Sequence, residues 1–298
     1  MRDSAWSPYL QERFSKILDE PPGLVCVDFD NTLIRGDFGE NLMEWLLREN
    51  FPLADEPEES SPRNLNSDAL LAIWGWNYEK LFRSPSVAKD LHVSRDKRWR
   101  DYVFEEYSYI RDTRGLGASY RWSSFLFSGW EESEFRSLAR KIWEENLRSY
   151  QMNPSFYKKY PYPFPMKVHP REPLLDFLLE LKSLGWIVNI VTASPAMAVE
   201  EATPKLGLSR SDVIGMQLCF NSLGRTTAEI IEPYPFGTGK VEAILKKFSR
   251  YPDLAFGDTV NDLAILQSAT RLGILFQRGY TDLNEKAQEQ NIYIEEWI

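Results

Sequence analysis

Short apolar runs recur along the chain, and amphipathic helical patterns separate several of them. The first run, Leu24–Asp28, follows Pro21-Pro22-Gly23, a combination typical of a turn. A run without polar alternation predicts a strand that is buried on both faces of a parallel sheet. We expect further strands in the comparable runs 186–192, 213–220, 254–256 and 272–276.

Two helical patterns lie between these predicted strands. The leucines of segment 174–181 form one broad stripe that ends at Gly185, which indicates a helix with one buried face. Segment 241–248 places apolar residues at the i, i+3, i+4 and i+7 positions of a second helix. Strands that alternate with such helices predict an α/β fold with a Rossmann-like, mainly parallel sheet flanked by helices.

Residues 37–165 have a different pattern, because helix follows helix there without an apolar strand between them. We expect helices at 41–49, 67–82, 97–110 and 131–150, and a return linker rich in proline and aromatic residues at 154–165. The chain is therefore predicted to form two domains. Residues 1–36 and 166–298 would be the α/β core, and 37–165 a mostly α-helical insertion.

Two aspartates, Asp28 and Asp30, come directly after or at the end of the first predicted strand, in the sequence Asp-Phe-Asp-Asn-Thr. Ligands of open parallel sheets bind beyond the carboxyl ends of the strands, so both carboxylates are expected in a site. One of them could attack phosphorus while the other gives and takes a proton. A turn that merely caps the strand explains this motif alone equally well.

A second acidic pair, Asp258 and Asp262, follows the predicted strand at 254–256. Their spacing of four residues places both on one face of a helix that begins there. Together with Asp28 they would offer the oxygen ligands that Mg²⁺ prefers. Helix capping by Asp258 explains one member of the pair, but not a second acidic cluster at another strand end.

A hydroxyl group and a lysine complete the candidate chemistry. Thr192 ends a predicted strand before Ala193-Ser194-Pro195 and a helical pattern, where hydroxyl and N–H groups can bind an anion or simply cap the helix. Lys240 stands in Gly237-Thr238-Gly239-Lys240, which completes neither a Walker loop nor a dinucleotide fingerprint. This lysine could neutralise a carboxylate and bind a phosphate oxygen, or it could be solvated.

Along the chain, an acidic pair is followed by a hydroxyl group, a lysine and a second acidic pair. Motifs in this order resemble those of the haloacid-dehalogenase-like superfamily of aspartyl-phosphate enzymes. The acid at Asp30 favours its phosphatases and phosphomutases over its dehalogenases and cation-pumping ATPases. A helical insertion after the first motif is similar to the phosphoserine-phosphatase-like group, in which a cap closes over the substrate and selects it. The four motifs stand here at Asp28–Thr32, Thr192, Lys240 and Gly257–Asp262.

The resemblance implies a role for each motif residue. Asp28 would be the nucleophile and Asp30 the general acid and base, while Thr192 and Lys240 hold the phosphoryl group. A Mg²⁺ cofactor would be bound by Asp28, the Asp30 carbonyl and Asp258, with the support of Asp262. The expected activity is Mg²⁺-dependent hydrolysis of a small phosphate ester.

The substrate is expected to be an amino-alcohol phosphate such as phosphocholine, phosphoethanolamine or phosphoserine. Asp37 occupies the position at which phosphoserine phosphatases carry an acid for the substrate's ammonium group, and Arg35-Gly36-Asp37 resembles the phosphorylcholine-phosphatase-like branch. Residues 37–165 also hold seven of the ten Trp and nine of the fourteen Tyr, which could surround a cation or simply fill a core. A substrate carboxylate held by Arg35 is the competing hypothesis. The predicted substrate-binding residues are Thr32, Arg35, Asp37, Ala193, Ser194 and Asn261.

Composition excludes several other classes of protein. The 298 residues include 44 acidic and 35 basic side chains, a net charge of −9 that argues against a nucleic-acid surface. The two cysteines and two histidines are far apart along the chain and lack the close ligand spacing of an ordinary structural zinc site. No signal peptide or run of about 18 apolar residues is present, so we expect a cytoplasmic protein without a membrane partner.

Two alternatives stay open at this point. A phosphotransferase or phosphomutase would use the same motifs, and only its products would differ. A non-catalytic phosphate-binding module would be marked by loss of Asp28 or Asp30, and both are present. The sequence leaves the oligomeric state open.

Overall fold

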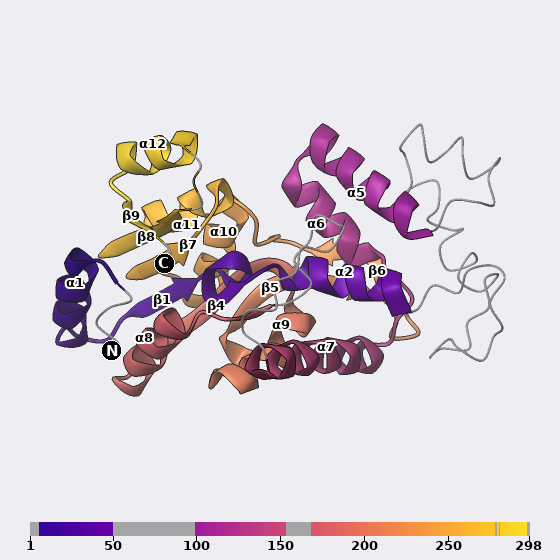
Figure 1. The fold of residues 1–298 in the computed structure, drawn as a ribbon, viewed down its shortest axis with the longest axis horizontal. Helices are drawn as coiled ribbons and strands as arrows, with labels where there is room; N and C mark the ends of the chain where they lie inside the picture. The colour runs from indigo at the N-terminus through magenta and orange to yellow at the C-terminus, as the bar shows by residue number, and fades with distance from the viewer. Residues whose placement is uncertain (1–5, 50–98, 153–167, 278, 280, 297–298) are drawn as a thin grey trace.

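The computed structural model describes residues 6–49, 99–152, 168–277, 279 and 281–296 (Figure 1). A seven-stranded sheet with the strand order β6-β5-β4-β1-β7-β8-β9 forms its centre. Neighbouring strands are parallel except for β5 and β6, so the predicted Rossmann-like, mainly parallel α/β fold is confirmed. The strands are β1 (Leu24–Val27), β4 (Ile187–Pro195), β5 (Val213–Phe220), β6 (Thr226–Ile231), β7 (Leu254–Gly257), β8 (Leu272–Gln277) and β9 (Tyr293–Glu296).

The five strands predicted from apolar runs all form, within a few residues of the expected bounds. The two strands of this sheet that were not predicted, β6 and β9, are its outer strands. Residues of both strands are largely half-buried or exposed. An outer strand buries fewer of its side chains than a central one, so it needs no continuous apolar run.

The two faces of the sheet are covered by different helices. Along β1, Val25 and Val27 point into one core cluster, and Leu24 and Cys26 point into the other. This alternation follows from the pleat of the strand. The first face packs against α1 (Pro8–Leu18), α8 (Glu172–Ser183) and α9 (Ala196–Ala202), and the second against α10 (Thr238–Phe248), α11 (Leu263–Ser268) and α12 (Thr281–Glu289).

Four described helices come from the predicted insertion: α2 (Phe38–Glu49), α5 (Trp99–Arg114), α6 (Leu116–Phe125) and α7 (Glu132–Met152). Figure 1 shows α2, α5 and α6 beyond the carboxyl end of β1, and α7 beside α9. Three of these helices were predicted; α6 was not, because its glycine and three serines are weak helix formers. The helix expected at 67–82 and the linker expected at 154–165 lie outside the described residues.

The buried side chains of these helices continue the core of the sheet. Phe38, Tyr107 and Trp143 belong to the same buried cluster as Val27 and Phe29. The division into a core domain and a cap domain therefore stays a prediction. A short antiparallel pair, β2 (Ile34–Arg35) with β3 (His169–Pro170), lies where the chain leaves the first motif and where it returns.

A buried carboxylate of α9 binds arginines of α7. The carboxylate of Glu201 is almost fully buried, and Arg140 Nη2 and Arg210 Nη2 donate to its Oε2 atom over 2.7 and 2.8 Å. Arg136 Nη1 lies 3.4 Å from the other oxygen of the same carboxylate. Removing the partners of a buried charge is costly, so these ion pairs hold the long helix α7 against α9.

No described helix combines the length and the apolar composition that would let it cross a membrane.

We predict that Phe177→Ala lowers the free energy of unfolding by about 3–5 kcal/mol, because it opens a cavity between α8, α1 and the sheet. The Phe177 ring is fully buried and stacks on Phe14 with ring centroids 4.0 Å apart. Urea unfolding followed by circular dichroism measures the effect. The control Leu223→Ala changes a residue that is 78% exposed and should stay within about 0.5 kcal/mol of the wild type. Equal unfolding midpoints for the two variants would contradict this packing.

Candidate active site

A small cavity of about 40 Å³, here called the acidic cavity, lies at the carboxyl ends of β1, β4 and β7. All the site residues predicted from the sequence line it except Thr32 and Arg35. Four segments far apart along the chain thus meet at one end of the sheet, as expected for an open parallel sheet. The predicted residues that line the cavity are Asp28, Asp30, Asp37, Thr192, Ala193, Ser194, Lys240, Asp258, Asn261 and Asp262.

The first motif forms an irregular turn that brings two carboxyl groups to the cavity. The Asp28 N–H donates to the Phe256 carbonyl over 2.9 Å, so this aspartate extends the pairing of β1 with β7 by one residue. Residues Phe29–Leu33 then turn sharply, with Asn31 in the left-handed region at φ 60°. Asparagine tolerates this conformation better than most residues. The turn therefore places Asp30 beside the same cavity two residues later.

Lys240 holds two buried carboxylates together. Its Nζ donates to Asp28 Oδ1 over 2.5 Å and to Asp262 Oδ1 over 2.6 Å, and only 2% of the lysine is exposed. Burial alone would lower the pKa of Lys240, but the two carboxylates raise it above its ordinary value. Burial raises the pKa of Asp28 to about 7, although the lysine acts in the opposite direction. The lysine therefore stays charged inside the protein.

Two glycines make this arrangement possible. A Cβ atom at Gly239 would lie 1.9 Å from the Tyr234 carbonyl oxygen, so only glycine lets the chain approach closely just before Lys240. A Cβ atom at Gly257 would lie 2.3 Å from Cβ of Asp262. Close packing therefore explains both the glycine before Lys240 and the glycine that begins the fourth motif. Neither glycine requires a phosphate-binding loop of the Walker type.

Asp262 is a positioning residue as well as a member of the acidic group. Its Oδ2 accepts hydrogen bonds from the N–H groups of Asp258 and Thr259 over 3.1 and 3.0 Å. Thr259 is the N-cap of the turn Val260–Asp262 and α11 begins at Leu263, so the prediction that Asp258 and Asp262 share one face of a helix is wrong, and Asp258 does not cap the turn either. The buried Thr32 hydroxyl donates to Asp258 Oδ1 over 3.0 Å. Thr32 therefore orients a carboxylate instead of lining the cavity.

The acidic group has the composition of a site for a divalent cation. Asp28, Asp258 and Asp262 are buried, and one oxygen of each lies within 4.8 Å of the others. Among the described residues that line the cavity, Lys240 alone is cationic, so the negative charge is only partly neutralised. Hard oxygen ligands with excess negative charge fit Mg²⁺. The side chain of Asp30 lies outside this group, and coordination by its carbonyl stays a prediction.

The carboxyl group of Asp30 faces two hydroxyl groups from the end of β4. Its Oδ2 accepts hydrogen bonds from Ser194 Oγ over 2.6 Å and from Thr192 Oγ1 over 3.3 Å, and its Oδ1 accepts from the Phe38 N–H over 2.7 Å. Burial, with a contribution from the nearby Asp37, raises the pKa of Asp30 to about 7. Such a carboxyl group can both give and take a proton near neutral pH.

Asp37 also lines the acidic cavity. Its Oδ1 accepts a hydrogen bond from the Glu40 N–H over 2.8 Å at the start of α2, and Tyr120 also bonds to this carboxyl group. Burial and the charge of Glu40 raise the pKa of Asp37 well above its usual range. Arg35 is exposed in β2, opposite His169, and does not line the cavity.

The cavity also contains residues that were not predicted. Asn31 and Thr259 stand inside the recognised motifs, so their position in the sequence could have indicated them. Tyr120 comes from α6 and Phe236 from the loop before α10. Neither belongs to a motif, and only the packing of these segments brings their rings to the site.

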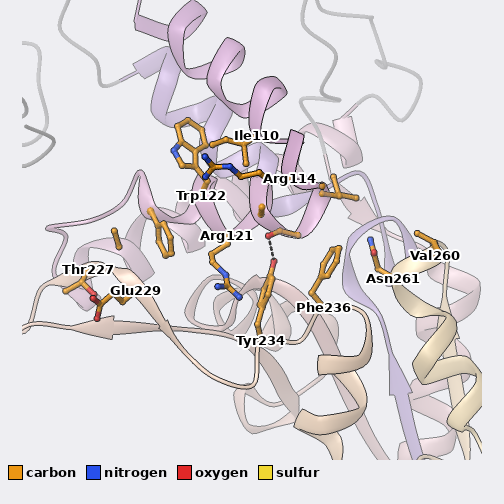
Figure 2. Close-up of a pocket in the computed structure, with 16 residues that line it drawn as sticks. Ile110, Arg114, Arg121, Trp122, Thr227, Glu229, Tyr234, Phe236, Val260 and Asn261 are labelled. Carbon is orange, nitrogen blue, oxygen red and sulfur yellow. Dashed lines mark hydrogen bonds between the residues drawn. The ribbon is translucent and has the colours of Figure 1, made fainter. Parts of the chain in front are cut away.

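A much larger groove adjoins the acidic cavity (Figure 2). It has a volume of about 960 Å³ and lies between α5 and α6 on one side and β6 and the loop before α10 on the other. Phe236 and Asn261 line both the groove and the acidic cavity, so the two spaces are adjacent. This space is called the groove below.

A family model described as haloacid dehalogenase-like hydrolase matches residues 101–267, which is more than half of the chain. The chain therefore belongs to this hydrolase family, and the superfamily predicted from the sequence is confirmed. The match includes Thr192, Lys240 and the second acidic pair, whereas Asp28 and Asp30 precede it. Membership of the family confirms that the protein is an enzyme of the hydrolase class and supports its interpretation as a phosphatase.

Several solved structures are similar to the chain. A functionally unknown protein from Anaerococcus prevotii DSM 20548 is 17% identical, with a TM-score of 0.62 over 97% of this chain and 92% of its own. A protein of unknown function from Bordetella pertussis Tohama I is 17% identical, with a TM-score of 0.53 over 92% of this chain and 98% of its own. A substrate-bound phosphoserine phosphatase is also similar, with 17% identity, a TM-score of 0.47, and coverage of 92% and 93%. No curated protein matches the sequence.

We predict that Lys240→Met lowers the free energy of unfolding by about 3–5 kcal/mol at neutral pH, because two buried carboxylates lose their shared partner. Urea unfolding in the absence of divalent cations measures this loss. Lys246→Met, which changes an exposed lysine of the same helix, is the matched control and should be close to the wild type. A Lys240→Met protein as stable as the control would show that the lysine does not hold the carboxylates together.

Proposed function

We propose that the protein is a Mg²⁺-dependent hydrolase of phosphate monoesters that forms a phosphoryl intermediate on Asp28. The observation that carries this proposal is the position of the Asp28 carboxylate. It lies at a strand end in contact with Lys240, in one group with the carboxylates of Asp258 and Asp262, and the cavity beside it is also lined by Asp30. A nucleophile, a proton carrier and a set of metal ligands thus converge on a space about the size of a phosphoryl group.

The reaction would proceed in two displacements at phosphorus. A carboxylate oxygen of Asp28 attacks, so that an oxygen–phosphorus bond forms as the bond from phosphorus to the alcohol oxygen breaks. Asp30 gives its proton to the departing alcohol oxygen. Water then attacks the phosphorus and gives a proton to Asp30, and the bond between Asp28 and phosphorus breaks to release inorganic phosphate.

Other residues of the cavity would support these steps by position and charge. Lys240 reduces the repulsion between the Asp28 carboxylate and an anionic phosphate, and it keeps the Asp28 carboxylate oriented. Thr192 and Ser194 fix the direction of the Asp30 carboxyl group. A Mg²⁺ ion held by Asp28, Asp258 and the Asp30 carbonyl would neutralise charge on the phosphate oxygens.

Transfer of the phosphoryl group to an acceptor other than water would use the same residues, and the products distinguish the two reactions. An amino-alcohol phosphate also stays a prediction as the substrate. Asp37 would have to receive its ammonium group, with Tyr120 and Phe236 as the nearby aromatic rings that line the acidic cavity.

Asp28→Asn is expected to reduce phosphate release by about 10³-fold or more, since a carboxamide cannot form the phosphoryl intermediate. Release of inorganic phosphate from a panel of phosphate esters with Mg²⁺ measures it. Asp176→Asn, which changes an exposed aspartate on α8, is the matched control and should keep full activity. Undiminished turnover by Asp28→Asn would exclude a phosphoryl intermediate on this residue.

Mg²⁺ is expected to raise the melting temperature of the wild type, and a chelator should abolish both the rise and the phosphatase activity. At about 100 times its dissociation constant, a bound ion stabilises the folded state by about 2.7 kcal/mol. Asp258→Asn removes one charged ligand and should lose most of this stabilisation, whereas Asp176→Asn should retain it. An equal shift in both variants would place the metal elsewhere.

A further inference from the structure

The size of the acidic cavity limits what it can hold. Its volume is about 40 Å³, and a single water molecule needs about 10–15 Å³ of such space. Such a space can take a phosphoryl group but not a larger ester, so the alcohol part of a larger ester must lie outside it. Phe236 and Asn261 line both this cavity and the groove of about 960 Å³, so the two spaces are neighbours. The groove is the adjoining space through which a bound ester would extend.

A row of three planar groups leads from the acidic cavity into the groove. The rings of Phe236 and Tyr234 are stacked, with centroids 5.7 Å apart and planes at 12° to each other. The guanidinium group of Arg121 lies 4.8 Å from the centroid of the Tyr234 ring. Figure 2 shows Tyr234 between Arg121 and Phe236, with all three side chains along the floor of the groove. The row begins at Phe236, which lines both the acidic cavity and the groove.

These planar groups are held in place by contacts with α6 and with the loop itself. The Tyr234 hydroxyl donates to the Gly117 carbonyl over 3.3 Å. A Cβ atom at Gly117 would lie 2.8 Å from the Phe236 ring, so the helix backbone packs directly against this ring. Arg121 Nη2 lies 3.3 Å from Glu232 Oε1. The row is therefore a preorganised surface, which lowers the cost of ordering side chains when a ligand binds.

Tyr234 is only 8% exposed between its two neighbours, so a ligand would meet the partly exposed Phe236 and Arg121. Aromatic and guanidinium groups favour flat, polarisable ligands, which bind by offset stacking and by cation–π contact. Trp122 adds a further ring to the lining of the groove, while Thr227 and Asn261 add hydrogen-bonding groups. We infer that the groove binds the alcohol part of the substrate and that this alcohol carries a planar aromatic or heteroaromatic ring. This inference rests on the proposed phosphatase function, since it assigns the leaving group of that reaction.

The test compares ring-bearing and small phosphate esters in the wild type and in variants of the groove. The probes are adenosine 5′-monophosphate and 1-naphthyl phosphate against phosphoethanolamine, each with Mg²⁺. Ala228→Trp fills the groove from β6, and Arg121→Ala removes one end of the planar row without adding bulk. Ile231→Trp is the matched control, because it changes a residue of β6 that is 53% exposed and does not line the groove.

The expected result is a kcat/KM for the better ring ester about tenfold or more above that for phosphoethanolamine. Ala228→Trp and Arg121→Ala should both lower this ratio, mainly through KM, and Ile231→Trp should leave it unchanged. A wild type that prefers phosphoethanolamine, or a ratio that neither groove variant changes, would overturn the inference and leave the proposed function intact.

Calorimetric binding of adenosine and 1-naphthol separates a failure of the inference from a failure of the proposed function. If no ester is hydrolysed, the phosphatase function fails. Binding of either free alcohol to the wild type, weakened in Ala228→Trp and Arg121→Ala but not in Ile231→Trp, would still support a ring-binding groove. Absence of binding together with absence of ring-ester preference would refute it.

Discussion

One buried lysine makes the site physically possible. Asp28, Asp258 and Asp262 lie close together in the interior, where like charges repel and water does not screen them. Lys240 donates to two of the three carboxylates, and its positive charge is in turn stabilised by them. The same two contacts join the end of β1 to the start of α10 and to the turn after β7. The geometry of the site therefore depends on how these three segments pack together.

Many of the remaining polar contacts hold these groups at fixed distances. Thr32 orients Asp258, the backbone N–H groups of Asp258 and Thr259 orient Asp262, and the hydroxyl groups at the end of β4 orient Asp30. A catalytic group that is already oriented loses little free energy on reaching the transition state. The buried Gly257 serves the same geometry, because any side chain there would displace Asp262.

In the proposed reaction, the acidic cavity would carry out the chemistry and the groove would recognise the substrate. The carboxylates and the lysine come from strand ends of the sheet, whereas the walls of the groove come from α5, α6, β6 and the loop before α10. Phe236 lines both spaces, since it precedes Lys240 by only four residues and its ring packs against Gly117 of α6. A change in the groove can therefore alter substrate preference while the reacting groups stay in place.

The sequence by itself determined the central strands, the alternation of strands and helices, and the residues of the four motifs. These features are local: an apolar run predicts a buried strand, and the acids and the lysine stand at fixed positions next to such runs. The pattern does not predict the outer strands β6 and β9, because they bury fewer side chains than the central strands. It does not predict α6 either, because contacts with the rest of the protein override the weak helix propensity of its glycine and serines. Only the tertiary structure decided that Thr32 supports Asp258, that Arg35 lies away from the cavity, and that Tyr120 and Phe236 line it. These facts depend on the packing of segments far apart in the chain, and no spacing within one segment records where another segment will lie.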